Sequence, residues 1–408
     1  MLLYDIGVRL YALAIRTAAL RKSKAKQWVR GRKDWHNRLR QAVKDWNGDR
    51  IWVHCASYGE LEQGRPLIEA LRKKYPGHRL LLTFFSPSGY EPFRDWRGAD
   101  AVFYLPLDTK SNSRDFLDIV NPRVAIFIKY EFWLNFLNEI RKREISCYLV
   151  SAVFKPHHPF FKWYGQIFRQ SLTAFSTLYI QDEKSGELLK KIGIRNFRVA
   201  GDTRFDRVLQ IRNETMRFGW LEQFKGNHDL IVAGSTWAGD ETLVLDALAV
   251  LGSAKLLLVP HDVDEKSLSA SIEKLDRSGF RYSIYSKGAD PSSQILLLDT
   301  IGMLARTYAY ADVAYIGGGF AGGLHNSLEA AVFGVPLTFY GTDYTKFNEA
   351  VELLTMGAAV NVRDAESLAA AWRRLLEPSQ KALIGRVLEE YFSRNSNNTK
   401  EIVESIRI

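Results

Sequence analysis

The sequence predicts an α/β protein with two doubly wound parallel sheets in succession, preceded by a basic N-terminal arm. Three observations lead to this prediction. Short apolar runs alternate with longer amphipathic segments from residue 50 onward, the alternation restarts near residue 230, and the excess positive charge is confined to the first 50 residues. Strands that alternate with helices form parallel sheets with helices on both faces. Two such series therefore predict two Rossmann-like domains.

The composition narrows the class of protein. The 408 residues are 46% hydrophobic and 25% charged, which is ordinary for globular proteins and excludes disordered and collagen-like chains. A chain of this length suggests about two or three domains. The two cysteines, Cys55 and Cys147, form no Cys-x-x-Cys pair, so the sequence supports neither a disulfide framework nor a zinc site.

The N-terminal arm carries nearly all of the net charge. Residues 1–50 contain thirteen Lys or Arg against four Asp, a net charge of +9, whereas the other 358 residues carry 43 cations against 42 acids. An apolar stripe runs through the same segment at spacings of three and four: Leu3, Ile6, Leu10, Leu13, Thr17 and Leu20. Its uncharged stretches are far shorter than the ~20 residues that span a bilayer.

The arm is therefore predicted to be an amphipathic helix that lies in a membrane interface, with a basic flank attracted to anionic lipid. The alternative is a helix packed on the protein's own core with a solvated basic face. Nucleic acid is not expected as a partner, because no recognition module accompanies the charge. On the membrane interpretation, we expect the arm to lie apart from the chemical site.

The predicted strands can be placed by residue number. The first series comprises Ile51–Cys55, Arg79–Phe85, Val124–Ile128, Cys147–Ser151 and Thr177–Gln181. The second series comprises Leu230–Ala233, Lys255–Val259, Ile295–Leu298 and Val313–Ile316. Helices are predicted between them, among them Leu61–Lys74, Phe132–Arg143 and Ser185–Ile192. The segment Gly201–Asn227 lacks strand character and is predicted to be the hinge region.

Chemistry is expected in the loops after the strands, because open α/β sheets bind ligands at the carboxyl ends of their strands. After the first strand the chain reads Ala-Ser-Tyr-Gly-Glu, and Glu60 leads into a helix. A carboxylate there can act as a general base, or it can merely favour the helix dipole. After Leu230–Ala233, the segment Gly234–Glu241 opens a helix whose N–H groups can bind an anion. The alternative for that segment is an ordinary helix cap.

Two further loops carry candidate residues. Five glycines fall within Gly317–Gly323, which indicates close approach of a ligand or unusual backbone dihedrals, and a helix start with His325, Asn326 and Glu329 follows. The alternative is a flexible lid. Beyond Pro260-His261, Asp262 and Asp264 spell the Asp-x-Asp metal pattern of some sugar transferases. We expect a helix cap there instead of a metal site.

Taken together, these loops resemble those of the bacterial Kdo transferases, which attach 3-deoxy-D-manno-octulosonic acid (Kdo) to lipid A precursors. The resemblance covers nearly the whole chain. It is carried by His54–Glu60, Thr83–Gly89, Leu105–Asp108, Glu131–Trp133, Gly201–Asp206, Gly234–Glu241 and Gly322–Glu329. Each segment alone is moderately specific for this family, whereas the occurrence of all of them in this order is strongly specific for it.

The resemblance implies a GT-B fold, in which two Rossmann-like domains face a cleft. It also implies CMP-Kdo as donor, a tetraacyl disaccharide bisphosphate lipid A precursor (lipid IVA) as acceptor, and inversion at the anomeric carbon without a metal or other cofactor. The expected location is the cytoplasmic face of the bacterial inner membrane, at a surface with anionic lipids. The competing enzyme hypothesis is another GT-B transferase that uses a UDP- or GDP-sugar, and a non-enzymatic membrane scaffold is the third.

Carried over by position, the resemblance makes Glu60 the general base, with Arg204 supporting the transition state where the family often has Lys. A second acid common in the family is replaced here by Lys129, so Glu131 is the candidate to stand in for it. The family's Pro-Arg is Pro260-His261 in this chain. The resemblance and the loop chemistry together give the expected donor-binding residues: Ser57, Gly59, Gly234, Ser235, Thr236, Pro260, His261, Gly302, Met303, Leu304, Gly318, Gly319, His325, Asn326, Ser327, Leu328 and Glu329.

The expected domain organisation follows from the same assignments. The arm spans residues 1–33, an acceptor-binding domain 34–210, a linker 211–228 and a CMP-Kdo-binding domain 229–385. The last helix, within 386–408, is expected to cross back to the first domain.

Overall fold

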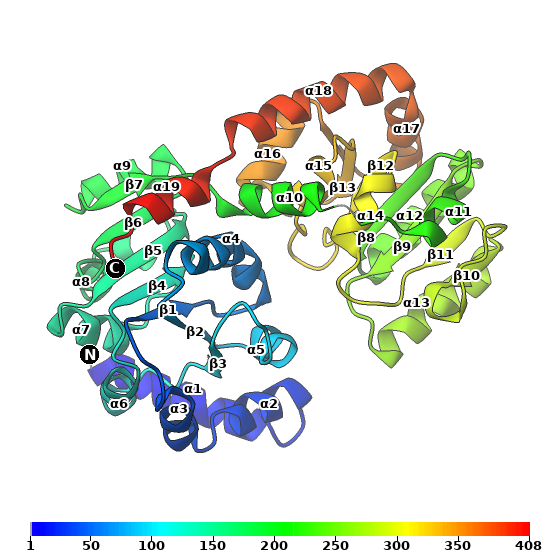
Figure 1. The fold of residues 1–408 in the computed structure, drawn as a ribbon. Helices are drawn as coiled ribbons and strands as arrows, with labels where there is room; N and C mark the ends of the chain where they lie inside the picture. Colours follow the sequence, from blue (N-terminus) through cyan, green and yellow to red (C-terminus); the bar gives the residue numbers. More distant parts are fainter. Residues whose placement is uncertain (1, 215) are drawn as a thin grey trace. The chain divides into compact units, whose positions relative to one another are not determined.

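A computed structural model describes residues 2–214 and 216–408, which divide into two units. Unit 1 consists of residues 1–207 together with 397–408, and unit 2 of residues 208–396. Each unit contains a seven-stranded sheet in which every described strand pair is parallel (Figure 1). The α/β class and the two Rossmann-like halves expected from the sequence are confirmed.

Unit 1 begins with three helices: α1 (Leu2–Ala18), α2 (Ser23–Gly31) and α3 (Trp35–Val43). Its remaining elements run β1 (Arg50–His54), α4 (Tyr58–Lys74), β2 (Arg79–Phe84), α5 (Pro87–Phe93), β3 (Ala101–Tyr104), α6 (Lys110–Val120), β4 (Val124–Ile128), α7 (Leu134–Lys142), β5 (Ser146–Ala152), η1 (Pro159–Phe161), α8 (Gln166–Leu172), β6 (Thr177–Ile180), α9 (Glu183–Lys191) and β7 (Phe197–Val199). The helix α10 (Thr203–Asn213) spans the boundary between the units, and α19 (Asn398–Ser405) belongs to unit 1.

The first sheet has the order β3-β2-β1-β4-β5-β6-β7. Side chains of a strand alternate between the two faces of its sheet, so Trp52 belongs to one core cluster while its neighbours Ile51 and Val53 belong to the other. Buried residues of α19, Ile402 and Val403, complete the second cluster, and α19 packs against α4 (Figure 1). The C-terminal segment is therefore part of the core of unit 1.

Unit 2 repeats the alternation of strands and helices. Its elements run α11 (Gly219–Lys225), β8 (Leu230–Thr236), α12 (Ala238–Leu251), β9 (Lys255–Pro260), α13 (Glu265–Ser278), β10 (Tyr282–Ile284), η2 (Tyr285–Lys287), β11 (Ile295–Leu297), α14 (Leu304–Thr307), η3 (Tyr308–Tyr310), β12 (Val313–Ile316), α15 (Leu328–Ala331), β13 (Leu337–Tyr340), η4 (Asp343–Lys346), α16 (Asn348–Thr355), β14 (Ala359–Val362), α17 (Ala365–Leu376) and α18 (Pro378–Arg394). The strand order is β10-β11-β9-β8-β12-β13-β14.

Some elements were not predicted from the sequence. The strands β3, β7, β10, β13 and β14 have only three or four residues and lie at or near the edges of their sheets, where a short apolar run gives little periodicity. Within the predicted hinge region the chain forms the helices α10 and α11. Among residues 2–214 and 216–408, no helix has both the length and the hydropathy needed to cross a bilayer.

Candidate functional site

The candidate base and the second acid follow the two central strands of the first sheet. The strands β1 and β4 are neighbours, and the chain winds in opposite directions on either side of them. Such a switch point is where open α/β sheets bind ligands, at the carboxyl ends of the strands. Glu60 follows β1 and Glu131 follows β4, so the topology brings together two residues that lie far apart in the sequence.

Glu60 is the third residue of α4 and closes a capping box with Ser57. The backbone N–H of Ser57 donates to Oε2 of Glu60 at 3.1 Å, while the Ser57 side chain accepts from the backbone at the start of the helix. This box satisfies two of the N–H groups that every helix start leaves unpaired. The helix-cap interpretation of Glu60 is thus correct, and it is compatible with the base, since the cap fixes where the carboxylate points.

The environment of Glu60 makes its carboxyl group a stronger base than usual. Its pKa is raised from 4.5 to about 7, first by burial and second by the negative charge of Glu131. The positive charge of Lys129 and hydrogen bonds to the backbone of Ala56 and Ser57 act in the opposite direction. A pKa near the working pH is what efficient general base catalysis requires.

Glu131 is a buried carboxylate, 7% exposed, with two hydrogen-bond partners. The indole N–H of Trp133 donates to its Oε2 at 2.6 Å, and Nε2 of the fully buried His54 lies 3.2 Å from the same oxygen. Burying a charge without such partners would cost several kcal/mol. The site therefore holds two acids, of which one is fixed by hydrogen bonds inside the protein.

Lys129 stands two residues before Glu131, in a strained backbone conformation. Its φ of +71° is left-handed, which costs a non-glycine residue ~1–3 kcal/mol and needs support from its surroundings. The support is a hydrogen bond from its backbone N–H to the carbonyl of Val150, 2.8 Å away. The structure thus places a cation where its charge acts on Glu60.

Arg204, far from Glu60 in the sequence, is joined to α4 through Asp202. Arg204 is bound to Asp202 through Nε at 2.7 Å and NH2 at 2.6 Å, so its charge is paired. Asp202 is in turn held by the amide of Gln63, one turn after Glu60 on α4. Gly59 has open space where a Cβ would stand, so the chain's own packing does not explain a glycine beside the candidate base.

The N-terminal arm is packed against this site, so the expectation that it lies apart is wrong. The ring of Tyr11, on α1, lies 6.0 Å from that of Phe85, and Phe85 lies 4.6 Å from Trp133, the residue that donates to Glu131. Arg32 fastens the arm further, with its guanidinium over the rings of Trp28 and Phe85. It also donates to the Phe85 and Leu105 carbonyls at 2.8 and 2.9 Å. Burial lowers the pKa of Arg32 to about 9, so it stays charged near neutral pH.

The first turns of α1 are fixed by polar contacts, and its apolar stripe points outward. The hydroxyl of Tyr4 donates to Oδ2 of the buried Asp108 at 2.5 Å, and Asn135 donates to Asp5 at 2.9 Å. On the outward side, Leu3 and Leu20 are each 84% exposed. A hollow of about 800 Å³ follows this face and is lined by Leu10, Leu13, Ala14, Thr17, Ala18, Leu20, Arg21 and Lys22. Apolar patches exposed in this way mark interaction sites.

In unit 2, the expected donor-binding residues gather at the carboxyl ends of β8, β9 and β12. Here too the central pair, β8 and β12, is a switch point. A Cβ on Gly234 would lie 2.0 Å from the Tyr308 hydroxyl and 2.9 Å from Leu304, so glycine is required there by packing. The backbone N–H of His261 donates to the Thr236 carbonyl at 2.9 Å, which joins the loops after β8 and β9.

Asp240 fixes the start of α12 to the glycine-rich loop. This fully buried carboxylate accepts from the backbone N–H groups of Trp237 and Gly318, each at 3.0 Å, and from the Tyr315 hydroxyl at 2.7 Å. The helix-cap interpretation of Gly234–Glu241 is therefore correct. Two N–H groups that could have bound an anion are occupied by this side chain.

Three aromatic rings are stacked beside Asp240. The ring centroids of Trp237 and His261 are 4.7 Å apart, and those of His261 and His325 are 4.4 Å apart. Burial, and then the proximity of His261, lower the pKa of His325 to about 4, so its imidazole is neutral near pH 7. Its Nε2 accepts from the Trp237 indole at 3.1 Å, which leaves the proton on Nδ1.

The glycine-rich loop approaches the chain's own backbone closely. A Cβ on Gly317 would lie 2.3 Å from the Ser235 carbonyl oxygen, and one on Gly319 would lie 2.0 Å from the Tyr340 carbonyl oxygen. Gly318 has a φ of +106°. The unusual dihedrals expected as one alternative are present at Gly318, and close packing against the chain's own backbone accounts for Gly317 and Gly319.

The segment after this loop holds the candidate ribose-binding acid. Asn326 donates to Oε1 of Glu329 at 3.0 Å and accepts from the Leu328 backbone at 3.2 Å. Glu329 lies on the short helix α15. The pKa of the buried Tyr308 is raised first by burial and second by the negative charge of Glu329. The buried Ser327 hydroxyl has no hydrogen-bond partner in the described parts of the chain, which makes it a candidate to bind a ligand.

The remaining candidates are placed as follows. Gly302, at a φ of +88°, and Met303 precede the short helix α14, which begins at Leu304. Asp264 caps α13 and accepts from the backbone of Lys266 and Ser267, both at 3.1 Å, so the expected cap is confirmed. Within residues 2–214 and 216–408, no cluster of three or more His, Cys, Asp or Glu is arranged to hold a metal ion.

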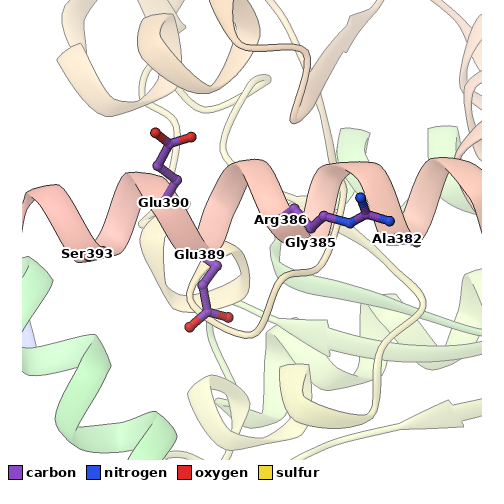
Figure 2. A pocket seen from close by; sticks show the side chains of 6 residues that line it. All are labelled: Ala382, Gly385, Arg386, Glu389, Glu390 and Ser393. Atoms are coloured by element: carbon purple, nitrogen blue, oxygen red, sulfur yellow. The ribbon is translucent and has the colours of Figure 1, made fainter.

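A second surface hollow, of about 530 Å³, lies along α18 (Figure 2). It is lined by Ala382, Gly385, Arg386, Glu389, Glu390 and Ser393. Figure 2 shows the side chains of Glu389 and Glu390 pointing to opposite sides of the helix. None of the expected site residues lines this hollow.

Sequence reasoning missed several residues that organise the two sites: His54, Trp133, Trp237 and Asp240. A signal existed for each, because all four lie inside the segments that carry the family resemblance. Their roles depend on partners far along the chain. His54 and Glu131, for example, are 77 positions apart.

Comparisons with known proteins agree with the architecture. Residues 33–207 match the family model described as 3-deoxy-D-manno-octulosonic-acid transferase (kdotransferase). The 3-deoxy-D-manno-octulosonic acid transferase of Bordetella pertussis is 27% identical over 375 residues, 87% of this chain and 86% of the relative. That of Aquifex aeolicus is 28% identical over 346 residues, 83% of this chain and 88% of the relative.

A solved structure of UDP-GlcNAc 2-epimerase from Neisseria meningitidis, bound to UDP-GlcNAc, matches the fold. Its TM-score is 0.60 at 13% identity, and the match covers 87% of this chain and 98% of that one. A likeness at this identity bears on the fold alone. The GT-B class implied by the sequence resemblance is confirmed.

Proposed function

We propose that this chain, a glycosyltransferase whose residues 33–207 match the 3-deoxy-D-manno-octulosonic-acid transferase family model, moves Kdo from CMP-Kdo to a lipid A precursor, lipid IVA, in lipopolysaccharide biosynthesis. The reaction inverts the anomeric carbon. The single observation that carries the proposal is the placement of Glu60 at the switch point of the first sheet, with a pKa raised to about 7.

In this mechanism, Glu60 takes the proton from the acceptor hydroxyl as the acceptor oxygen attacks the anomeric carbon. Glycosyl transfer passes through an oxocarbenium-like centre, and inversion needs the base on the acceptor side. The capping box holds the carboxylate in place, and the open space beside Gly59 gives the acceptor room to approach. Burial, and then the negative charge of Glu131, keep the pKa of Glu60 raised.

The donor is proposed to bind at the strand ends of unit 2. The buried Ser327 hydroxyl and the carboxylate of Glu329 are suited to the hydroxyl groups of a ribose, and the Nδ1 proton of His325 is suited to an oxygen of the nucleotide. Electrostatic stabilisation of the leaving CMP phosphate is assigned to helix starts and to Arg204.

The reaction is proposed to need no metal or other cofactor. Asp264 is engaged as a helix cap, which argues against Asp262 and Asp264 as a metal pair. Transfer is therefore expected to proceed equally in excess EDTA. A loss of turnover that Mg²⁺ or Mn²⁺ restores would return these two aspartates to consideration as ligands.

The membrane surface is the proposed place of action, on the cytoplasmic face of the inner membrane. An acyl-chain acceptor resides in the bilayer, and the exposed apolar face of α1 with its basic flank suits an interface containing anionic lipid. The contact of Tyr11 with Phe85 would place that surface beside the base.

Mass spectrometry of the product formed from CMP-Kdo and lipid IVA tests this proposal. The expected result is a mass increase of one or more Kdo units with release of CMP, and the product mass counts the units added. The alternative, another GT-B transferase, predicts no product from CMP-Kdo and transfer from a UDP- or GDP-sugar instead. Parallel reactions with those donors distinguish the two hypotheses.

A further inference from the structure

A chain of hydrogen bonds runs through the first sheet and ends at Glu131. The indole N–H of Trp52 donates to Oγ1 of Thr83 at 2.8 Å, and the same oxygen lies 2.8 Å from Nδ1 of His54. On the other side of the imidazole, Nε2 lies 3.2 Å from Glu131. His54 and Thr83 are paired residues of the neighbouring strands β1 and β2, so the register of these strands holds the two side chains together.

The partners assign the tautomer of His54. The Thr83 hydroxyl has two acceptors, Nδ1 of His54 at 2.8 Å and the Val53 carbonyl at 3.4 Å, and the shorter contact is the stronger one. When Thr83 donates to Nδ1, the neutral imidazole carries its proton on Nε2, which faces the Glu131 carboxylate. The indole N–H of Trp133 lies 3.1 Å from Nε2 and 2.6 Å from Oε2 of Glu131, and the shorter contact assigns it to the carboxylate. The other tautomer would then place the lone pair of Nε2 against the Glu131 carboxylate.

Two charged groups near this chain of hydrogen bonds act on the pKa of Glu60. Glu131 raises the pKa of Glu60, whereas Lys129 lowers it. The buried Cys55 thiol faces both acids, and its pKa is raised by burial, then by Glu60, then by Glu131. The charge of Glu131 is therefore, after burial, the largest contribution that raises the pKa of Glu60.

We propose that His54 is a positioning residue for the base: by donating from Nε2, it holds the Glu131 carboxylate in place as the fixed negative charge that faces Glu60. The proposal rests on the proposed function, since it matters only if Glu60 accepts a proton from the acceptor. His54 itself touches neither substrate. Without its donor, the Glu131 carboxylate keeps only the Trp133 bond described above and can turn away from Glu60.

Two isosteric variants separate this role from a general structural one. In His54→Gln the distal amide nitrogen replaces Nε2 and can still donate to Glu131. In His54→Asn the amide reaches only the position of Nδ1. Both remove the imidazole from the same buried position, so His54→Gln is the matched control for His54→Asn.

The measurement is the pH dependence of kcat/KM with CMP-Kdo and a detergent-dispersed acceptor, using the full chain. We expect the acid limb of His54→Asn to move to lower pH by about one unit. The plateau of kcat should fall about 3- to 10-fold, because a weaker base is less effective, while the donor KM stays unchanged. His54→Gln should retain the acid limb of the parent. In a Glu131→Gln background, His54→Asn should produce no further shift, because the charge it positions is gone.

Equal shifts in both His54 variants, no shift in either, or a further shift in the Glu131→Gln background would overturn the proposal. If His54→Asn does not fold, the tautomer can be read in the parent protein from the imidazole ¹⁵N shifts of selectively labelled histidine, assigned by difference from His54→Gln. A proton on Nε2 is expected, and a proton on Nδ1 contradicts the proposal. If Glu60→Gln retains turnover, the base assignment fails. If only the His54 results fail, the base assignment survives.

Discussion

The backbone N–H of Ser57 donates to the carboxylate of Glu60 across 3.1 Å, which ties the candidate base to the first turn of its own helix. The base is therefore held by local structure, while its raised pKa comes first from burial and second from Glu131, which follows a different strand of the sheet. Position and pKa are thus set by different parts of the chain.

The pH profile of transfer should report the raised pKa of Glu60. The base works only when ionised, and its pKa is raised to about 7. We expect kcat/KM to fall ~tenfold per pH unit below that value. An acid limb near the ordinary carboxyl pKa of about 4.5 would contradict the assignment. Because Glu60 and Glu131 interact, the limb belongs to the pair of acids.

Removing Glu329 should weaken donor binding. Its carboxylate is proposed to accept from a ribose hydroxyl, and losing a buried acceptor costs ~1–3 kcal/mol, about a 5- to 150-fold increase in Kd. Calorimetry of CMP binding to Glu329→Ala measures the change. Glu366→Ala, which removes an exposed acid at the start of α17, is the control and should bind as the parent does. Parent-like affinity in Glu329→Ala would remove this residue from the donor site.

Charge reversal on the arm should weaken membrane binding without stopping chemistry. Lys22, Lys24 and Lys26 are exposed, and each contributes ~1 kcal/mol of attraction to anionic lipid. The triple change to Glu should reduce co-sedimentation with anionic vesicles, and salt should reduce that of the parent. Turnover on a dispersed acceptor should persist, because these three side chains are exposed to solvent.

Tyr11→Ala supplies the contrast to the lysine variant. Its ring packs on Phe85, which contacts Trp133, so this change should lower turnover even on the dispersed acceptor. Normal sedimentation of the triple variant at physiological salt would show that the three lysines do not contribute to membrane binding. Parent-like turnover of Tyr11→Ala would separate the arm from the site.

The features predictable from the sequence are those that local chemistry determines. The central strands are continuous apolar runs, as strands buried on both faces must be. The Asp264 helix cap is predictable because it depends only on Asp264 and the three residues that follow it. Glu60 was a candidate because it follows a strand at a turn with glycine, and the family resemblance gave it the role of general base.

The features that escaped prediction depend on distant partners. The contact of His54 with Glu131 requires β1 and β4 to be neighbours, and no local pattern states which strands pair. Asp240 is locally a helix cap, yet its bond to Gly318 joins residues 78 positions apart. The contact of the arm with the site was missed because its charge and apolar stripe describe the outward face of α1, while Tyr11 contacts Phe85.

The most direct test of the central claim is turnover by Glu60→Gln with CMP-Kdo and lipid IVA, measured by mass spectrometry of the product. Glu69→Gln, an exposed acid on the same helix, is the matched control. Folding raises the pKa of Glu60, so the stability linked to its proton is present below its unfolded pKa and is lost as pH rises through about 7. Glu60→Gln should therefore be at least as stable as the parent at pH 8.

Glu60→Gln keeps the shape of the side chain and removes the base, which typically contributes 10²- to 10⁴-fold to the rate. The account predicts that kcat falls by about this factor, with CMP binding unchanged and Glu69→Gln within about twofold of the parent. Product formation by Glu60→Gln at more than about a tenth of the parent rate would contradict the assignment of Glu60 as the general base.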